Sequence, residues 1–144
     1  MMERCSLCEP QLGPVLSVGH EWTLVLNHNQ NLLGKCMWVL RRHEESVVAL
    51  TLDEWRALQL GIIQATTALQ QVFQPNHYNY AFLQNQDRHV HMHIIPRYAT
   101  ERTLAGQTFL DPDYPGHYAV PGPVHRLDPT TLAEVAACIR QFLT

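Results

Sequence analysis

Three histidines alternate with apolar residues between positions 89 and 95, where the sequence reads His-Val-His-Met-His-Ile-Ile. Successive side chains of an extended strand point to opposite faces, so His89, His91 and His93 are predicted to line one face of a strand. An imidazole titrates near neutral pH and acts as a nucleophile, a base or a metal ligand. The plain alternative is a histidine-rich surface strand, and repetition at every second position argues against it.

A second chemical motif is the pair of cysteines in Cys5-Ser6-Leu7-Cys8. This spacing lets two thiolates bind one zinc ion through a tight turn, and two more ligands are then needed for a closed tetrahedral site. The alternative is a pair of reduced thiols without a metal. The other cysteines, Cys36 and Cys138, fall in a predicted strand and a predicted helix, where each is most simply a small buried residue.

Composition predicts one globular domain over the 144 residues, with 46% hydrophobic and 16% charged side chains. The net charge is −3 and there is no long Lys/Arg tract, which argues against polymeric nucleic acid or an anionic membrane surface as the partner. No apolar run reaches the length of a membrane span, and residues 1–10 lack the apolar core of a signal peptide. We therefore expect a cytoplasmic protein.

The first half of the chain predicts a hairpin followed by a long helix. Residues 22–26 and 35–40 form apolar strands, and residues 27–33 supply the turn between them. Thr51 followed by Glu54 is the pattern of a capping box, which opens a helix that runs to about residue 73. The predicted inner face of this helix consists of Trp55, Leu58, Ile62, Ala65 and Leu69.

The second half predicts two more strands, over 77–83 and 89–95, then a long ordered loop over 100–126. Asp128-Pro129 begins a C-terminal helix, because proline is favoured at the first helical position. Its predicted inner face consists of Leu132, Val135, Ile139 and Phe142. Strand hairpins separated by one long helix indicate an α+β fold with an antiparallel sheet.

Residues 89–95 match the signature of the histidine triad (HIT) superfamily, His-φ-His-φ-His-φ-φ with φ apolar. Val25-Leu26-Asn27, with Gly34 and Met37-Trp38-Val39-Leu40, resembles the first hairpin of that family. Arg41-Arg42-His43 resembles its Pro-Lys-Arg-His stretch, with Leu40 where proline is usual. Over about residues 5–98 the chain resembles the zinc-bearing, dinucleoside polyphosphate hydrolase-like branch. The resemblance implies a HIT-like sheet, one long helix after the first hairpin and a C-terminal helix.

The resemblance also implies a reaction, because family members bind a nucleotide and cleave at its α-phosphorus. His91 is then the nucleophile, and it forms a nucleotidyl-histidine intermediate that water hydrolyses. One ring nitrogen attacks while the other donates a hydrogen bond, for which we expect a backbone carbonyl as acceptor. His93 is expected to hydrogen-bond a phosphate oxygen or the leaving group. The alternative for each histidine is a purely structural imidazole.

The same resemblance implies the remaining zinc ligands. In zinc-bearing branches they are the histidine before the helix and the first triad histidine, which here are His43 and His89. With Cys5 and Cys8 they make a closed Cys2His2 set, with residues 1–10 as the zinc-binding turn. A closed set leaves no position for substrate, so the zinc is expected to be structural.

The nucleotide contacts implied by resemblance are Asn27 for the ribose and Gln84 and Asn85 for the phosphates. An alternative for Asn27 is a turn residue in a left-handed conformation. The loop before the triad is shorter than in many members and lacks their Gly-Gln-Ser/Thr-Val stretch. Arg97 or Arg88 is therefore expected to replace some phosphate contacts, unless each is simply a solvated surface charge.

Several alternatives remain open at the level of sequence. A transferase would use phosphate or a sugar phosphate in place of water. A metallohydrolase would use His89 and His93 to hold a catalytic metal. A regulatory module would bind a nucleotide with little turnover. Family members are commonly homodimers, so the resemblance implies one here. The loop 111–118 could close over a base or form a rigid surface loop.

Overall fold

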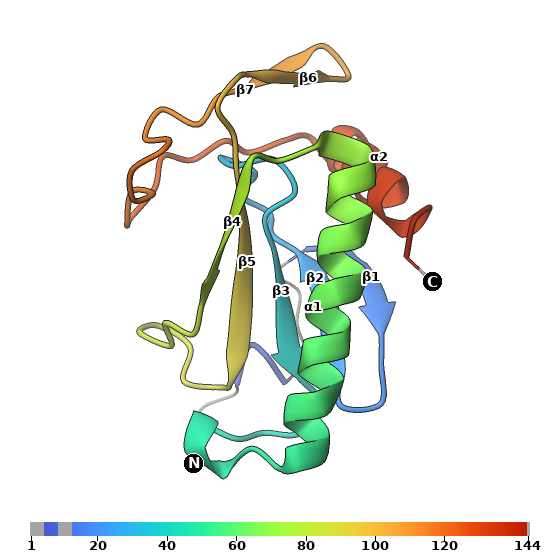
Figure 1. Cartoon of the computed structure of the whole chain (residues 1–144), viewed down its shortest axis with the longest axis vertical. Helices are drawn as coiled ribbons and strands as arrows, with labels where there is room; N and C mark the ends of the chain where they lie inside the picture. Colours follow the sequence, from blue (N-terminus) through green and yellow to red (C-terminus); the bar gives the residue numbers. More distant parts are fainter. Residues whose placement is uncertain (1–4, 9–12, 144) are drawn as a thin grey trace.

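The computed structural model describes residues 5–8 and 13–143, so part of the predicted zinc-binding turn over 1–10 lies outside the described residues. Five strands form one antiparallel sheet in the order β1-β2-β3-β5-β4. Figure 1 shows the long helix α1 lying across one side of this sheet. The fold is α+β, with one long helix after the first strands and a C-terminal helix, as predicted.

The first hairpin consists of β2 (Trp22–Leu26) and β3 (Cys36–Leu40), which pair from Trp22 opposite Leu40 to Leu26 opposite Cys36. The predicted strands are confirmed here. The sequence prediction missed β1 (Val15–Val18), a short edge strand that pairs with β2 through an irregular register. It also missed one turn of 3-10 helix, Val47–Ala49.

The triad strand is β5 (His91–Arg97), which lies between β3 and β4 (His77–Ala81). The predicted range of 89–95 was two residues too early, because the chain at His89 bends toward the cysteines before the β3 ladder begins. The predicted alternation is confirmed, since Val90, Met92 and Ile94 are all buried in the main core.

The helix α1 (Leu52–Phe73) begins with the predicted capping box between Thr51 and Glu54. Its buried face packs on β2, and at Gly61 on Trp38 of β3, and it includes Leu58, Ala65 and Leu69, as expected. Trp55 was wrongly placed in the core: it lies at the edge, 39% exposed, with its ring against Phe82. Ile62 is only half-buried and packs against the core from its margin.

The second helix, α2 (Pro129–Arg140), begins at Asp128, whose side chain accepts a hydrogen bond from the Thr131 backbone. It packs against α1 and β1, and Leu132, Val135 and Ile139 are buried as predicted. Phe142 was wrongly assigned to the core. It follows the end of the helix and is 41% exposed.

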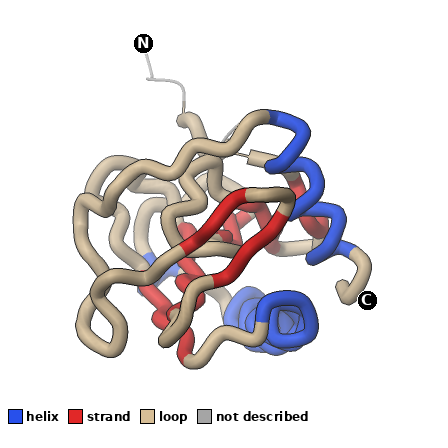
Figure 2. The backbone as a smooth tube through the Cα atoms, turned by 90° about the horizontal axis from the view of Figure 1, so that it is seen from above, coloured by secondary structure: helices blue, strands red, loops and turns tan. Residues whose placement is uncertain are grey.

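The segment predicted as a long loop over 100–126 contains a hairpin of β6 (Arg102–Leu104) and β7 (Gln107–Phe109). Figure 2 shows this hairpin above the sheet, with α1 seen end-on beside it. The rest, residues 111–126, is irregular, and we call it the strap. Its described contacts with Asn29 include hydrogen bonds to the Pro123 carbonyl and from the His125 backbone.

The two faces of the sheet have different coverings. Alternate residues of β2, β3 and β5 face the helices and form the main core. Val25, Met37 and Val39 face the other way and form a second apolar cluster with Leu7 of the Cys5–Cys8 turn. His91 pairs with Val39 and His93 with Met37, so both histidines lie on this helix-free face. No helix in the described part of the chain is long and apolar enough to span a membrane.

Candidate active site and zinc centre

The four predicted zinc ligands lie together at one end of the helix-free face. One ligand atom from each of Cys5, Cys8, His43 and His89 lies within 4.8 Å of all the others. The His43 and His89 Nδ1 atoms are 3.2 Å apart, and the Cys5 Sγ–His89 Nδ1 and Cys8 Sγ–His43 Nδ1 distances are both 3.3 Å. The bond lengths of zinc to nitrogen and sulfur in a tetrahedron imply ligand separations of about 3.3–3.8 Å. The arrangement therefore fits zinc.

A tight turn positions the two cysteines. The Cys8 backbone N–H donates to the Cys5 carbonyl at 3.2 Å, and Leu7 between them is buried against Val25, Met37 and Val39. Ser6 Oγ donates to the Asp87 carboxylate at 2.6 Å, which ties the turn to the loop before His89. The turn thus covers the sheet face that carries the histidines.

His43 is positioned by its neighbour Arg42. The Arg42 guanidinium donates two hydrogen bonds to the Glu54 carboxylate, at 2.7 and 2.9 Å, and a third to the Ala49 carbonyl. Glu54 belongs to the capping box of α1, so the chain at His43 is fastened to the start of the helix. The Arg42 interactions hold the pKa of Glu54 well below its usual range, at about 2.

His89 is buried and oriented by a second hydrogen bond. Its Nε2 donates to the Leu40 carbonyl at 2.6 Å, while Nδ1 faces the cysteines. A metal-ligating histidine commonly donates its other ring N–H in this way, which fixes the tautomer that binds metal. Together with the zinc-compatible geometry, the thiolate and imidazole donors support a structural zinc.

The cluster argues against a catalytic metal held by His89 and His93. His93 is not part of the described four-ligand group, and the four protein donors fill a tetrahedron without it. The first triad histidine, His89, therefore has a different role from His91 and His93. His89 belongs to the zinc-compatible cluster, whereas His91 and His93 line a pocket farther along the same sheet face.

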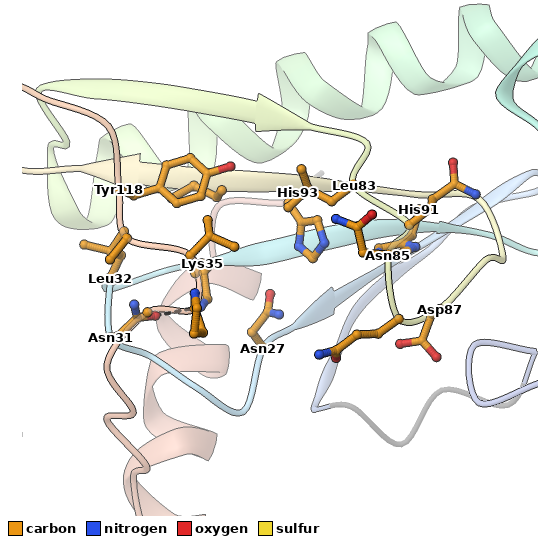
Figure 3. A pocket seen from close by; sticks show the side chains of 17 residues that line it. Asn27, Asn31, Leu32, Lys35, Leu83, Asn85, Asp87, His91, His93 and Tyr118 are labelled. Carbon is orange, nitrogen blue, oxygen red and sulfur yellow. Dashed lines mark hydrogen bonds between the residues drawn. The ribbon is translucent and has the colours of Figure 1, made fainter.

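The pocket holding His91 and His93 has a volume of about 340 Å³, within the usual range for small-molecule sites. Figure 3 shows His93 at its centre, with His91 to one side and Lys35 to the other. Asn27, Gln84 and Asn85 also line it. The structure thus brings the predicted nucleotide-site residues together except for Arg97 and Arg88, and Arg88 lines a separate pocket.

His91 has a defined ring orientation. Its Nδ1 lies 2.7 Å from the backbone carbonyl oxygen of His89, and a carbonyl only accepts, so Nδ1 carries the proton. The lone pair is then on Nε2. The predicted backbone acceptor for this ring is confirmed, and it is the carbonyl of the triad's first histidine. The His91 and His93 rings meet edge to face with centroids 4.8 Å apart.

His93 is neutral at physiological pH. Burial, followed by repulsion from His91 and Lys35, lowers the pKa of His93 to about 4. A neutral ring has one N–H donor and one acceptor nitrogen. It can therefore donate to a phosphate oxygen without adding a second fixed charge to a pocket that already contains the Lys35 ammonium.

Asn27 directly follows β2 at the pocket wall, and its Oδ1 atom is buried without a hydrogen-bond partner among the described residues. Such an orphaned acceptor is costly unless a ligand or water satisfies it. Asn27 is not among the described residues with a left-handed backbone. The left-handed conformation of the turn-residue alternative is therefore not seen at Asn27.

Gln84 and Asn85 lie where predicted, in the short loop before the triad. The Gln84 backbone is left-handed, with φ of 50°, and its amide nitrogen donates to the carbonyls of Glu45 and Arg88. Gln84 therefore holds the loop in shape with its amide N–H groups. Asn85 is exposed at the pocket rim.

Arg97 does not line the pocket, contrary to the expectation that it could contact phosphate. Its guanidinium is 3% exposed and pairs with the buried Asp111 carboxylate at 2.7 Å, with further bonds to Asn79 and the Gly116 carbonyl. It is therefore neither a phosphate ligand here nor a solvated charge. Its role is to fasten the start of the strap to the sheet.

Lys35 and Asn31 are among the pocket residues that sequence reasoning did not single out, and Tyr118 belongs to the loop 111–118, for which closure over a base was one alternative. For Lys35 a signal existed, because it precedes Met37 and Val39 at steps of two and so shares their face of the sheet. Asn31 lies in the β2–β3 turn and Tyr118 in the strap. Their positions depend on tertiary packing, which no local pattern predicts.

The shape of the molecule matches solved structures of histidine triad proteins. Those from Bradyrhizobium japonicum and Sinorhizobium meliloti align with TM-scores of 0.74 and 0.76 at 16% and 19% identity. The alignments cover 93% and 92% of this chain, and 92% and 91% of those proteins. A zinc-bound histidine triad family protein from Mycobacterium smegmatis aligns with a TM-score of 0.65 at 13% identity, covering 96% of this chain and 90% of its own.

Neither a family model nor a curated protein sequence matches the chain. At these identities the structural matches establish the fold, which is the histidine triad fold. Within that fold, the Cys/His cluster is consistent with the zinc-bearing branch.

Proposed function

We propose that this chain is a nucleotide hydrolase that cleaves at the α-phosphorus of dinucleoside polyphosphates or related nucleotide conjugates. The observation that carries the proposal is the hydrogen bond from His91 Nδ1 to the His89 carbonyl. It fixes the tautomer whose Nε2 lone pair is available in the pocket. The same carbonyl stabilises the positive charge that the ring acquires as it attacks phosphorus.

In the first step Nε2 of His91 forms a bond to the α-phosphorus, and the bond from phosphorus to the leaving group breaks. The electron pair departs with the leaving group. In the second step water attacks the same phosphorus and releases one proton to solvent, the N–P bond breaks and its electron pair returns to Nε2. The products are a nucleoside monophosphate and the leaving group. Neutral His93 donates its N–H to a non-bridging phosphate oxygen or to the leaving group.

The nucleotide contacts follow from the unused polar groups of the pocket. The orphaned Oδ1 of Asn27 accepts a hydrogen bond from a ribose hydroxyl in this proposal. Asn85 supplies an amide to phosphate, and Gln84 holds the loop that presents it. Arg97 is left out of the proposed nucleotide site, because its donors are occupied by Asp111, Asn79 and Gly116.

The zinc site would act indirectly by fixing His89. Cys5, Cys8, His43 and His89 would hold the ion, which contributes folding free energy when bound. The His89 carbonyl orients His91, so the position of the proposed nucleophile depends on this cluster. Zinc-binding thiols are best kept reduced, which supports the cytoplasm as the proposed compartment.

We also propose a homodimer. β4 is an edge strand of the sheet, and Tyr80 on it is 50% exposed. An edge strand with exposed apolar side chains is a site for pairing with another chain. Sedimentation of the purified protein is expected to give twice the chain mass of 16.5 kDa, and a monomer at micromolar concentration would contradict this.

The decisive test of the proposed activity is His91→Ala, with His20→Ala as the matched control, because the His20 side chain is 92% exposed. We expect His91→Ala to lose at least about a thousandfold in kcat, because no other side chain can form the adduct. Rapid quenching with a nucleotide labelled at the α-phosphorus should trap a nucleotidyl-histidine at residue 91 in wild type.

The alternatives give different results in the same assay. A His91→Ala variant that retains a tenth of the wild-type rate would contradict covalent catalysis. Tight nucleotide binding with no turnover in wild type would indicate a regulatory module. Transfer to added phosphate or sugar phosphate in preference to water would indicate a transferase.

A further inference from the structure

Lys35 is the only lysine in the chain, and its side chain lies in the pocket with His91 and His93. It precedes β3 and shares the sheet face of Met37, which pairs with His93. Figure 3 places Lys35 on the side of His93 away from His91. The Lys35 ammonium therefore lies next to His93, which is expected to contact the leaving group, and on the far side of His93 from the nucleophile His91.

The ammonium is held in place by a neutral partner. Lys35 Nζ donates to Asn31 Oδ1 at 2.6 Å, and no ion pair among the described residues involves Lys35. Asp87 also lines the pocket, but Figure 3 shows it on the other side of His93 from Lys35. Burial lowers the pKa of Lys35 to about 8.

The strap forms the wall of the pocket at the end where Lys35 lies. A β-carbon added to Gly122 would lie 2.6 Å from Asn31 Nδ2, so the strap backbone passes directly against the amide that holds Lys35. Tyr118, farther back along the strap, lies over the buried Arg97 guanidinium, with 5.9 Å between that group and the ring centre. Lys35 is thus pre-positioned, with little freedom left to lose on binding.

We propose that Lys35, fixed by Asn31 and the strap, is an anion subsite for the leaving group, so that the enzyme prefers substrates whose leaving group carries further phosphates. This proposal rests on the proposed hydrolase function. As the bond from the α-phosphorus to the bridging oxygen breaks, the electron pair stays on that oxygen and the polyphosphate leaves as an anion. A fixed ammonium beside it stabilises that developing charge. An amine leaving group gains nothing from the same contact.

The first experiment compares two substrates with wild type, Lys35→Met and the control Arg56→Met, which removes one positive charge from exposed α1. One substrate is diadenosine tetraphosphate and the other is adenosine 5′-phosphoramidate, whose leaving group is ammonia. We expect Lys35→Met to lower kcat/KM at least tenfold for the tetraphosphate and less than twofold for the phosphoramidate. Arg56→Met should change neither. Equal losses on both substrates would overturn the proposal.

The second experiment needs no turnover. An acetylating N-hydroxysuccinimide ester forms stable amides only with Lys35 and the N-terminal amine, because the 144-residue sequence has no other lysine. We expect inorganic pyrophosphate to slow acetylation of Lys35 at least fivefold, read by peptide mass, without slowing the N-terminal amine. Absence of protection would overturn the subsite. If wild type cleaves neither substrate, the hydrolase proposal fails, and pyrophosphate protection still decides whether Lys35 binds phosphate.

Discussion

His89 links the Cys/His cluster to the pocket, because its ring belongs to the cluster and its backbone carbonyl contacts His91 in the pocket. The ring lies between the cysteines and the Leu40 carbonyl. Its own carbonyl oxygen accepts from His91. His89 therefore connects the zinc-compatible cluster to the proposed nucleophile, His91. The connection runs through the His89 backbone carbonyl and needs no contact between the two side chains.

The first prediction at the residue scale concerns Asn27, whose Oδ1 is buried and orphaned. Asn27→Ala should weaken binding of adenosine monophosphate by about 1–3 kcal/mol, because a ribose hydroxyl loses its acceptor. Calorimetric titration measures this directly. Asn27→Asp is the matched control, since it keeps an oxygen acceptor at the same place. Affinity in Asn27→Ala equal to that of wild type would remove Asn27 from the nucleotide site.

At the residue scale, the sequence predicted which side chains carry the chemistry better than it predicted the partners that surround them. Alternation placed His91 and His93 on one face, and the need for a fixed tautomer led to the backbone acceptor that the structure contains. Arg97 was misjudged because its partner Asp111 is far along the chain and joins it only after folding. Long-range ion pairs of this kind leave no local pattern.

At the scale of elements, α1 lies unusually close to β3 at Gly61. A β-carbon there would lie 2.9 Å from the buried Trp38 ring. Alanine normally stabilises a helix interior relative to glycine by about 1 kcal/mol. We predict the opposite sign here: Gly61→Ala should lower the free energy of unfolding by about 1–3 kcal/mol through overpacking.

Denaturant unfolding of Gly61→Ala measures this effect, with Gln59→Ala on the exposed side of α1 as control. The control should change the free energy of unfolding by less than about 0.5 kcal/mol. A stabilised Gly61→Ala variant would mean that Trp38 moves aside, and that the close approach of α1 to β3 is not rigid.

A pH prediction concerns the junction of α1 with the loop that carries His43. The pKa of Glu54 is lowered from 4.5 to about 2, mainly by its hydrogen bond from Arg42. A lowered carboxylate pKa stabilises the fold above the unfolded-state value, and this is lost as pH falls from about 4.5 to about 2. Because Arg42 is 43% exposed, solvent screening limits the contribution to about 1 kcal/mol.

The difference in unfolding free energy between wild type and Glu54→Gln isolates this contribution. It should be about 1 kcal/mol at pH 7 and approach zero near pH 2, since protonated Glu54 resembles glutamine. A difference that stays constant over this range would show that the Arg42–Glu54 pair does not stabilise the junction through charge.

Elements with strong local signals were predicted, and those without them were missed. The capping-box pair Thr51 and Glu54 predicted the start of α1, and Asp128-Pro129 predicted the start of α2. In contrast, β1 is a four-residue edge strand with an irregular register. The β6–β7 turn uses Ala105 and Gly106, both with positive φ, where an Asn-Gly pair would have signalled a hairpin.

At the scale of the whole molecule, the zinc cluster joins the N-terminal turn to the centre of the fold. We predict about one zinc ion per chain in protein purified under reducing conditions. Cys8→Ser should lose the metal and lower the melting temperature by several degrees, because metal-binding free energy is partly folding free energy. Elemental analysis and thermal melting measure the two effects.

The matched control is Cys138→Ser, on α2 and outside the described four-ligand cluster. It should keep the zinc. A wild-type sample without zinc, or a Cys8→Ser variant with unchanged metal content, would contradict the assignment of the four ligands.

The pairing of β5 with β3 also has a consequence for how faithfully the chain folds. A slip of one residue would turn His91 and His93 into the apolar core and bring Met92 out. Two imidazoles buried there without partners would cost several kcal/mol, so the slipped register is much less stable than the observed one. A strand with valine at both positions would lose this discrimination. The side chains that we assign to phosphate chemistry therefore also favour the correct register of β5 against β3.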